Sequence, residues 1–315
     1  MEILPSRAIW PWRVGRREGT LLERRTFLGG TVRKLARVLA PHHETNSPPQ
    51  VRGRVGGDRA DTSDAWGAST VLLALGPLSF GYRGSIGKIG GPKQQVVLGL
   101  LLESRGRNVS TDRLIDCVWP GEAPKSARGT IHSYLSNLRK TVGDLIASDV
   151  DSYRIEVGPD NFDVLRFEHE VAAGRRVLAT DPGQSVHRFR AALKLWRGDP
   201  YMGLTDCPVL ADEAARLNDA RLAVLEDCFD AELALGHHAG IVQELEALVS
   251  ENGYRERLVG QLMLALHECG RRADALKVYS RAHEELFYGF GIAPGRELQE
   301  LEQKIRRHTP TIPPP

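Results

Sequence analysis

"SARGTIHSYLSNLRKTVG", residues 126–143, decides the fold of the first half of the chain. Ile131, Leu135, Leu138 and Val142 recur at steps of four, three and four, which is the spacing of one helical face. The side chains between them are polar or basic, and no Asp or Glu occurs from residue 125 to residue 143. A solvated helix face usually mixes acids with lysines. The stretch therefore predicts a helix that buries one face in its own domain and offers the other to a polyanion.

The residues before this helix predict short strands and two further helices. "VLLAL", "LSF" and "IGKI" are apolar runs separated by glycines, which is typical of small antiparallel strands. "GPKQQVVLGLLLESRG" predicts a helix with Pro92 in its first turn, where the missing N–H costs nothing. "VSTDRLIDCVWP" predicts a second helix capped by Ser110 or Thr111, and Ser126 is the expected cap of the third.

The residues after this helix predict a β-hairpin. "LIASDVDSYRIEV" has two β-rich runs around a polar centre. Small strands, three helices and a closing hairpin together predict a winged helix-turn-helix. In that fold the third helix enters the major groove of DNA, where phosphates repel carboxylates and where Ser, Thr, Asn, His and Arg can hydrogen-bond to bases or phosphates.

Geometry divides the expected DNA-binding residues into two roles. Basic side chains in the loop, on the helix and on the hairpin are expected to contact phosphates, and the polar outer face is expected to select the sequence. Arg154, the arginine of the hairpin, could equally be a solvated side chain that makes no DNA contact. The full set of candidates is Lys125, Arg128, Thr130, His132, Ser133, Ser136, Asn137, Arg139, Lys140 and Arg154.

The second half of the chain reads as helix after helix and contains a repeat. Gly236 and Gly270 lie 34 residues apart, and so do Ala231 and Ala265. Thirty-four residues is the tetratricopeptide period, in which helix pairs stack because no pair can bury its apolar faces alone. The expected roles of such an array are partner binding and dimerisation.

These patterns predict a fold that is mainly α with a small β component: a winged helix-turn-helix domain followed by an all-α tetratricopeptide-like helical repeat domain. The expected division is a disordered basic extension over 1–69, a DNA-binding domain over 70–158, the helical domain over 159–308 and a disordered tail over 309–315. The formal net charge of the 315 residues is only +2, so a nucleic-acid surface must be local.

Several other classes of protein are excluded by what the sequence lacks. No apolar run is long enough for a membrane helix, and the basic residues after "RRTFLGG" argue against an export signal, so the protein is expected to be cytoplasmic with reduced cysteines. His237 and His238 are adjacent and have no third ligand nearby, so no metal site is expected. No catalytic motif or cofactor fingerprint is present, and we expect no enzyme activity and no cofactor.

The motifs "LGPLSF", "GGPKQQVVLGLLL" and "VSTDRLIDCVWPGEAPKSARGTIHSYLSNLRKTVG" resemble the Streptomyces antibiotic regulatory protein (SARP) family. "ALKLWRGDPYMGL" and "FGIAPGRELQELEQKI" resemble that family's second domain, and the likeness extends from about residue 71 to residue 308. The resemblance implies an OmpR-like winged helix joined to a bacterial transcriptional activation domain. It also implies a transcriptional activator that binds direct repeats in promoters of biosynthetic, often antibiotic, gene clusters and that engages RNA polymerase.

The expected partners are thus double-stranded promoter DNA, RNA polymerase and a second protomer on an adjacent repeat, with no membrane. One departure concerns the third helix, which reads "SNLRK" where the family often has "SRLRR", so that Asn137 stands at a common Arg position. Arg pairs with guanine and Asn with adenine, which predicts a shifted base preference. The alternatives left open by the sequence are a helical-repeat scaffold that binds protein and a ligand-gated repressor.

Overall fold

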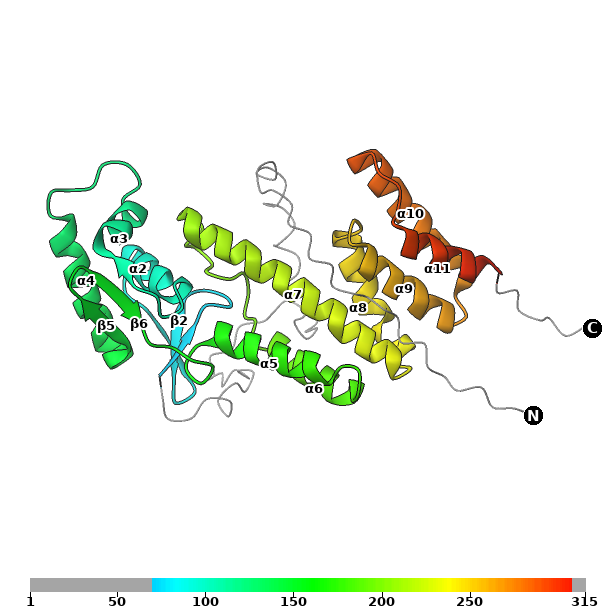
Figure 1. Ribbon diagram of the computed structural model, residues 1–315, viewed down its shortest axis with the longest axis horizontal. Helices are drawn as coiled ribbons and strands as arrows, with labels where there is room; N and C mark the ends of the chain where they lie inside the picture. The colour runs from blue at the N-terminus through cyan, green and yellow to red at the C-terminus, as the bar shows by residue number, and fades with distance from the viewer. Residues whose placement is uncertain (1–69, 308–315) are drawn as a thin grey trace, which may run out of the picture.

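The computed structural model describes residues 70–307, which form a small mixed lobe and an extended array of helices (Figure 1). The mainly α fold with a small β component is confirmed. The predicted basic extension over 1–69 and the predicted tail over 309–315 lie outside the described residues. Between residues 70 and 307, no helix is both long and apolar enough to cross a membrane.

The lobe contains two small antiparallel sheets. The first sheet has the order β1-β2-β3 and the second has the order β4-β6-β5. Their strands are β1 (Val71–Leu73), β2 (Ser79–Tyr82), β3 (Ser85–Lys88), β4 (Val109–Ser110), β5 (Ile146–Asp149) and β6 (Ser152–Ile155). The second sheet closes the winged helix, because β5 and β6 form the predicted hairpin and β4 pairs with β6.

Three helices fill the lobe: α2 (Pro92–Glu103), α3 (Thr111–Val118) and α4 (Ala127–Val142). Ser110 caps α3 as predicted, because its hydroxyl accepts a hydrogen bond of 3.2 Å from the N–H of Arg113. The predicted cap of α4 is wrong in detail. Ser126 occupies the N-cap position, but its side chain makes no capping hydrogen bond. Its ψ of 8° departs from the extended backbone that a side-chain cap normally needs.

The wing turns tightly between β5 and β6. Asp149 pairs with Ser152, so Val150 and Asp151 alone form the turn, and neither has a positive φ. The carbonyl of Asp151 accepts a hydrogen bond of 3.0 Å from the N–H of Thr111. The wing is therefore attached to the start of α3 by a turn of ordinary backbone conformation.

The second half of the chain forms a stacked array of helices that extends along the long axis of the molecule (Figure 1). Its helices are α5 (Asp163–Val177), α6 (Pro182–Leu193), α7 (Pro208–Ala234), α8 (His238–Glu251), α9 (Glu256–Glu268), α10 (Arg272–Phe290) and α11 (Arg296–Arg307). The 34-residue repeat is visible at two helix ends. Gly236 and Gly270 have φ values of 78° and 76°, and the next N–H bonds back to Glu232 O at 3.0 Å and to Leu266 O at 2.8 Å. Both turns are glycine C-caps of the same type.

Strand β1 and the residues after it join the two halves. The N–H of Leu72 donates to Asn161 O at 2.8 Å, the N–H of Arg197 to Leu75 O at 2.7 Å, and the N–H of Tyr201 to Ala74 O at 3.0 Å. Segments of the helical half therefore flank this stretch, and the apolar core runs without a break from one half into the other. The predicted domain boundary between residues 158 and 159 stays a prediction. The packing of the apolar core is continuous across that position.

Asp163 completes this junction from the start of α5. The carboxylate is fully buried and accepts hydrogen bonds from the N–H groups of Ala74, at 2.8 and 3.0 Å, and of Leu75, at 3.0 Å. Arg197 lies 3.5 Å from the same carboxylate. A single side chain thus satisfies two buried backbone donors of the lobe and one cation of the helical half.

Candidate nucleic-acid interface

The apolar stripe of α4 is buried as predicted. Ile131, Leu135, Leu138 and Val142 all lie in the core of the lobe. The opposite face is open to solvent and consists of residues that can donate or accept hydrogen bonds: Arg128, His132, Ser133, Ser136, Asn137 and Lys140. Lys125 is exposed in the loop before the helix, and Thr130 is half-buried. The structure therefore gathers most of the predicted binding residues on one helical face.

The polar side chains of this face keep part of their hydrogen-bonding capacity free. The hydroxyls of Thr130 and Ser133 each donate to the carbonyl four residues earlier, at 3.0 Å, which leaves their oxygens able to accept. The Nζ of Lys140 donates to Oδ1 of Asn137 at 3.1 Å. This contact leaves the amide N–H₂ of Asn137 available to a base acceptor.

Arg128 connects α4 to both neighbouring elements. Its guanidinium donates to Asp112 at 2.7 Å on α3 and makes a second ion pair with Asp151 in the wing turn. The side chain is half exposed, so it remains at the surface. Its charge is nevertheless shared between two carboxylates, and its first role is to fix the wing and α3 against α4.

Arg139 is directed toward the wing rather than outward. Its Nε and Nη2 both donate to the carbonyl of Ile146 at 3.1 Å, and Nη2 also bonds to the hydroxyl of Ser148. Both acceptors belong to β5, so Arg139 attaches the hairpin to the end of α4. The predicted phosphate contact would have to compete with these bonds.

The tip of the wing is acidic. Asp149 and Asp151 flank Val150, whose side chain is fully exposed at the tip. Arg154 pairs with Glu156 at 3.0 Å, so a phosphate contact of the wing arginine would compete with this exposed ion pair. Compared with the wing, α4 and the loop before it therefore offer the more positive surface. The two aspartates were visible in the sequence, but their position at the tip followed only from the strand register.

Two aromatic contacts position α4 from either side. His132 meets Tyr153 of β6 edge to face, with ring centroids 6.2 Å apart. Tyr134 stacks on Trp119 at 6.4 Å, and Lys93 lies 4.6 Å over the same indole. Tyr134 thus packs against the end of α3. Tyr153 is a positioning residue that the sequence reasoning did not identify.

The helical half shows no comparable chemistry. Among residues 70–307 no group of His, Cys, Asp and Glu side chains is arranged to hold a metal ion. Nδ1 of His237 lies 2.8 Å from Glu232 instead. Trp196 packs edge to face on Phe167 at 5.5 Å and is buried in the apolar core.

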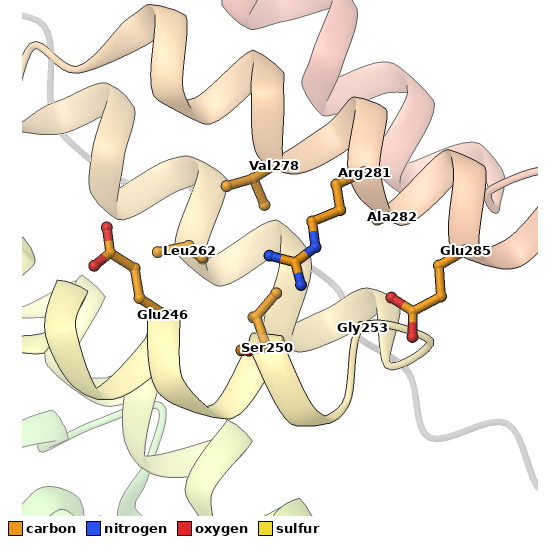
Figure 2. A pocket seen from close by; sticks show the side chains of 9 residues that line it. Glu246, Ser250, Gly253, Leu262, Val278, Arg281, Ala282 and Glu285 are labelled. Carbon is orange, nitrogen blue, oxygen red and sulfur yellow. The ribbon is translucent and has the colours of Figure 1, made fainter.

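A pocket of about 270 Å³ opens between α8, α9 and α10 (Figure 2). Its floor is apolar, Arg281 extends into it from α10, and Glu246 and Glu285 stand at its two ends. The volume is below the range of about 300–1,000 Å³ that is usual for pockets of small-molecule ligands. The pocket therefore gives the ligand-gated alternative little support.

A winged helix with an acid-free third helix, packed on a stacked helical array, defines the class of DNA-binding transcriptional regulators. Comparison with known proteins agrees. Residues 162–306 match the family model of the bacterial transcriptional activator domain. The chain is 33% identical over 253 residues to the regulatory protein DnrI of Streptomyces peucetius, which covers 76% of this chain and 92% of DnrI. The chain belongs to the SARP family of transcriptional regulators, which are not enzymes.

The mycobacterial regulator EmbR is a second similar protein. EmbR of Mycobacterium tuberculosis is 35% identical over 244 residues, and the match spans 75% of this chain but only 63% of EmbR. A solved structure of that EmbR in complex with a low-affinity phosphopeptide aligns with a TM-score of 0.73 and 34% identity, over 76% of this chain and 66% of the EmbR chain. The regulatory protein AfsR of Streptomyces coelicolor is 34% identical over 243 residues, which is 24% of AfsR.

Proposed function

We propose that the chain activates transcription by placing the outer face of α4 in the major groove of promoter DNA. One observation carries this proposal: from residue 125 to residue 143 the helix and its leading loop present polar and basic side chains without a single acid. Such a surface binds duplex DNA favourably, because each neutralised phosphate releases counterions and each base edge offers hydrogen-bond partners. Lys125 and Lys140 are the phosphate ligands best supported by exposure.

The junction at β1 decides how this proposal must be tested. A fragment that ends near residue 158 would lose Asp163, Arg197 and Tyr201, and with them partners for Ala74, Leu75 and the buried core. Loss of DNA binding by such a fragment would then report unfolding. The full chain is the appropriate sample, and equilibrium binding to its own promoter region, located by footprinting, is the direct assay.

The first prediction concerns the hydrogen bonds by which Arg139 holds β5 of the wing against α4. Arg139→Ala should weaken binding to matched and random DNA alike by about tenfold, because it frees β5 from α4. Arg139→Lys keeps the charge but cannot form the same forked contact with Ile146 O. If Arg139 acts through the wing, the Lys variant should behave like the Ala variant. A Lys variant with wild-type affinity would show instead that Arg139 serves as a phosphate ligand.

The second prediction concerns sequence choice. The N–H₂ of Asn137 can donate to adenine N7, and the second lone pair of its Oδ1, beside the Lys140 contact, can accept from the adenine amino group, whereas an arginine there suits guanine. Asn137→Arg should therefore change the base selected at one position of each half-site, with a discrimination of about 1–3 kcal/mol. Selection from random repeats would reveal the change. An identical selected motif for both proteins would refute the assignment of Asn137 to base recognition.

The finer parts of the proposal concern the regulator's targets and partners. Membership of the SARP family favours control of a secondary-metabolite gene cluster, binding to direct repeats and recruitment of RNA polymerase. Two protomers on adjacent repeats would gain affinity, because the first raises the effective concentration of the second. Footprints over paired repeats upstream of biosynthetic genes, and lower transcript levels after deletion of the gene, are the expected results.

A further inference from the structure

The hairpin formed by β2 and β3 is a second charged surface, separate from α4. No Asp or Glu occurs from residue 70 to residue 102. Arg83 and Lys88 are exposed, and neither forms an ion pair within residues 70–307. Two apolar side chains accompany them: Tyr82 is 43% exposed and Ile86 is 59% exposed. The hairpin thus combines unpaired cations with uncovered apolar area.

The turn of this hairpin is strained at Arg83. Tyr82 pairs with Ser85, so Arg83 and Gly84 alone form the turn, and their φ values are 46° and 74°. Two consecutive positive φ values are typical of turns that favour Asn-Gly, and an arginine in the first position costs free energy. The guanidinium lies 5.2 Å over the Tyr82 ring and makes no hydrogen bond to residues 70–307 that would compensate. A strained residue without a structural reason points to a functional one.

Position and composition favour a protein partner over DNA. In Figure 1, β2 lies on the side of the lobe that faces α5, whereas α4 lies at the opposite edge. Arg83 and Lys88 could bind DNA phosphates, but Tyr82 and Ile86 would contribute nothing to phosphate binding. Tyr and Arg are instead the residues that anchor protein interfaces, with apolar neighbours that exclude water. The absence of acids fits a partner surface of negative charge.

We propose that the β2–β3 hairpin docks on an acidic, partly apolar protein surface of the transcription machinery at the promoter. This inference rests on the proposed function, since the hairpin would meet that surface only when α4 holds the chain on DNA. Arg83 supplies the charge, Tyr82 holds its guanidinium outward, and Ile86 fills an apolar recess on the partner.

The test replaces Arg83 by the residue that the turn prefers. Arg83→Asn relieves the backbone strain, so the melting temperature of the full chain should stay the same or rise. Affinity for promoter DNA should stay within twofold. Recruitment of RNA polymerase holoenzyme to that promoter, and the transcript it yields, should fall at least fivefold. Ile86→Ser should reproduce the loss, and Lys277→Asn, which removes an exposed cation on α10, should not.

Each other result overturns the proposal in a different way. Wild-type recruitment by both hairpin variants would exclude the hairpin as a docking element. The hairpin would instead be a DNA-binding element if its variants lost DNA affinity and if the salt dependence of their binding constant corresponded to about one phosphate contact fewer. A wild-type chain that binds its promoter but does not recruit the holoenzyme would refute the docking partner while DNA recognition by α4 stands.

Discussion

Ser136→Glu is expected to lower the affinity of the full chain for its promoter at least 100-fold. Ser136 is exposed in the middle of the outer face of α4, between the sites expected to meet base edges and phosphates. A carboxylate there would face the polyanion directly, and like charges brought together at an interface cost several kcal/mol. A 100-fold loss corresponds to about 2.7 kcal/mol. Fluorescence anisotropy with a labelled duplex at fixed salt measures the effect.

A matched variant separates this local repulsion from a change in net charge. Ser280→Glu places the same substitution on an exposed position of another helix, α10, and should change DNA affinity less than threefold. Both variants should keep the wild-type melting temperature, since neither side chain is buried. Equal losses for the two variants would mean that α4 has no special place in DNA binding.

Asp163→Ala is expected to remove about 3–5 kcal/mol from the free energy of unfolding. The substitution leaves the N–H groups of Ala74 and Leu75 without acceptors and Arg197 without its buried counter-charge. Urea unfolding of the full chain measures the loss. Asp160→Ala, at an exposed position three residues earlier, is the control and should change stability by less than about 0.5 kcal/mol. An Asp163 variant of unchanged stability would show that the junction contributes little.

The same carboxylate makes stability depend on pH with a defined sign. Burial raises the pKa of Asp163 from 3.8 to about 6, against the opposing effects of its backbone hydrogen bonds and of Arg197. Because the folded-state pKa lies above the unfolded one, this group favours the folded state most below pH 4, and that advantage is lost as the pH rises to 6. The stability of the wild type relative to Asp163→Asn should fall by roughly 3 kcal/mol across this window. An unchanged difference would contradict the burial of an ionisable carboxyl group.

The local features of this chain followed from its sequence. The spacing of the apolar residues alone identified the buried stripe of α4, since Ile131 and Leu135 repeat at helical spacing. The cap of α3 by Ser110 and the glycine turns 34 residues apart were also correct, because each depends only on neighbouring residues. The two-residue strand β4 was not predicted, because it is short and exists only through its pairing with β6.

The features that the sequence did not reveal depend on distant partners. Arg128 and Arg139 were assigned to DNA from their place on the helix, but their partners in the wing become neighbours only when the hairpin folds back on α4. Asp163 bonds to residues 88 and 89 positions away, and nothing around it marks it as buried. The run "VLLAL" was predicted as one strand. It is regular only over β1, because Ala74 and Leu75 bond to Asp163 instead.

The most direct test of the account places a photo-crosslinking amino acid at position 133 of α4 and, separately, at position 280 of α10. The full chain is then irradiated on its specific promoter duplex and on a random duplex. The account predicts that position 133 crosslinks to bases within the major groove of the specific site and that position 280 does not crosslink. A chain that remains bound to its promoter while position 133 fails to reach any base would contradict recognition by α4.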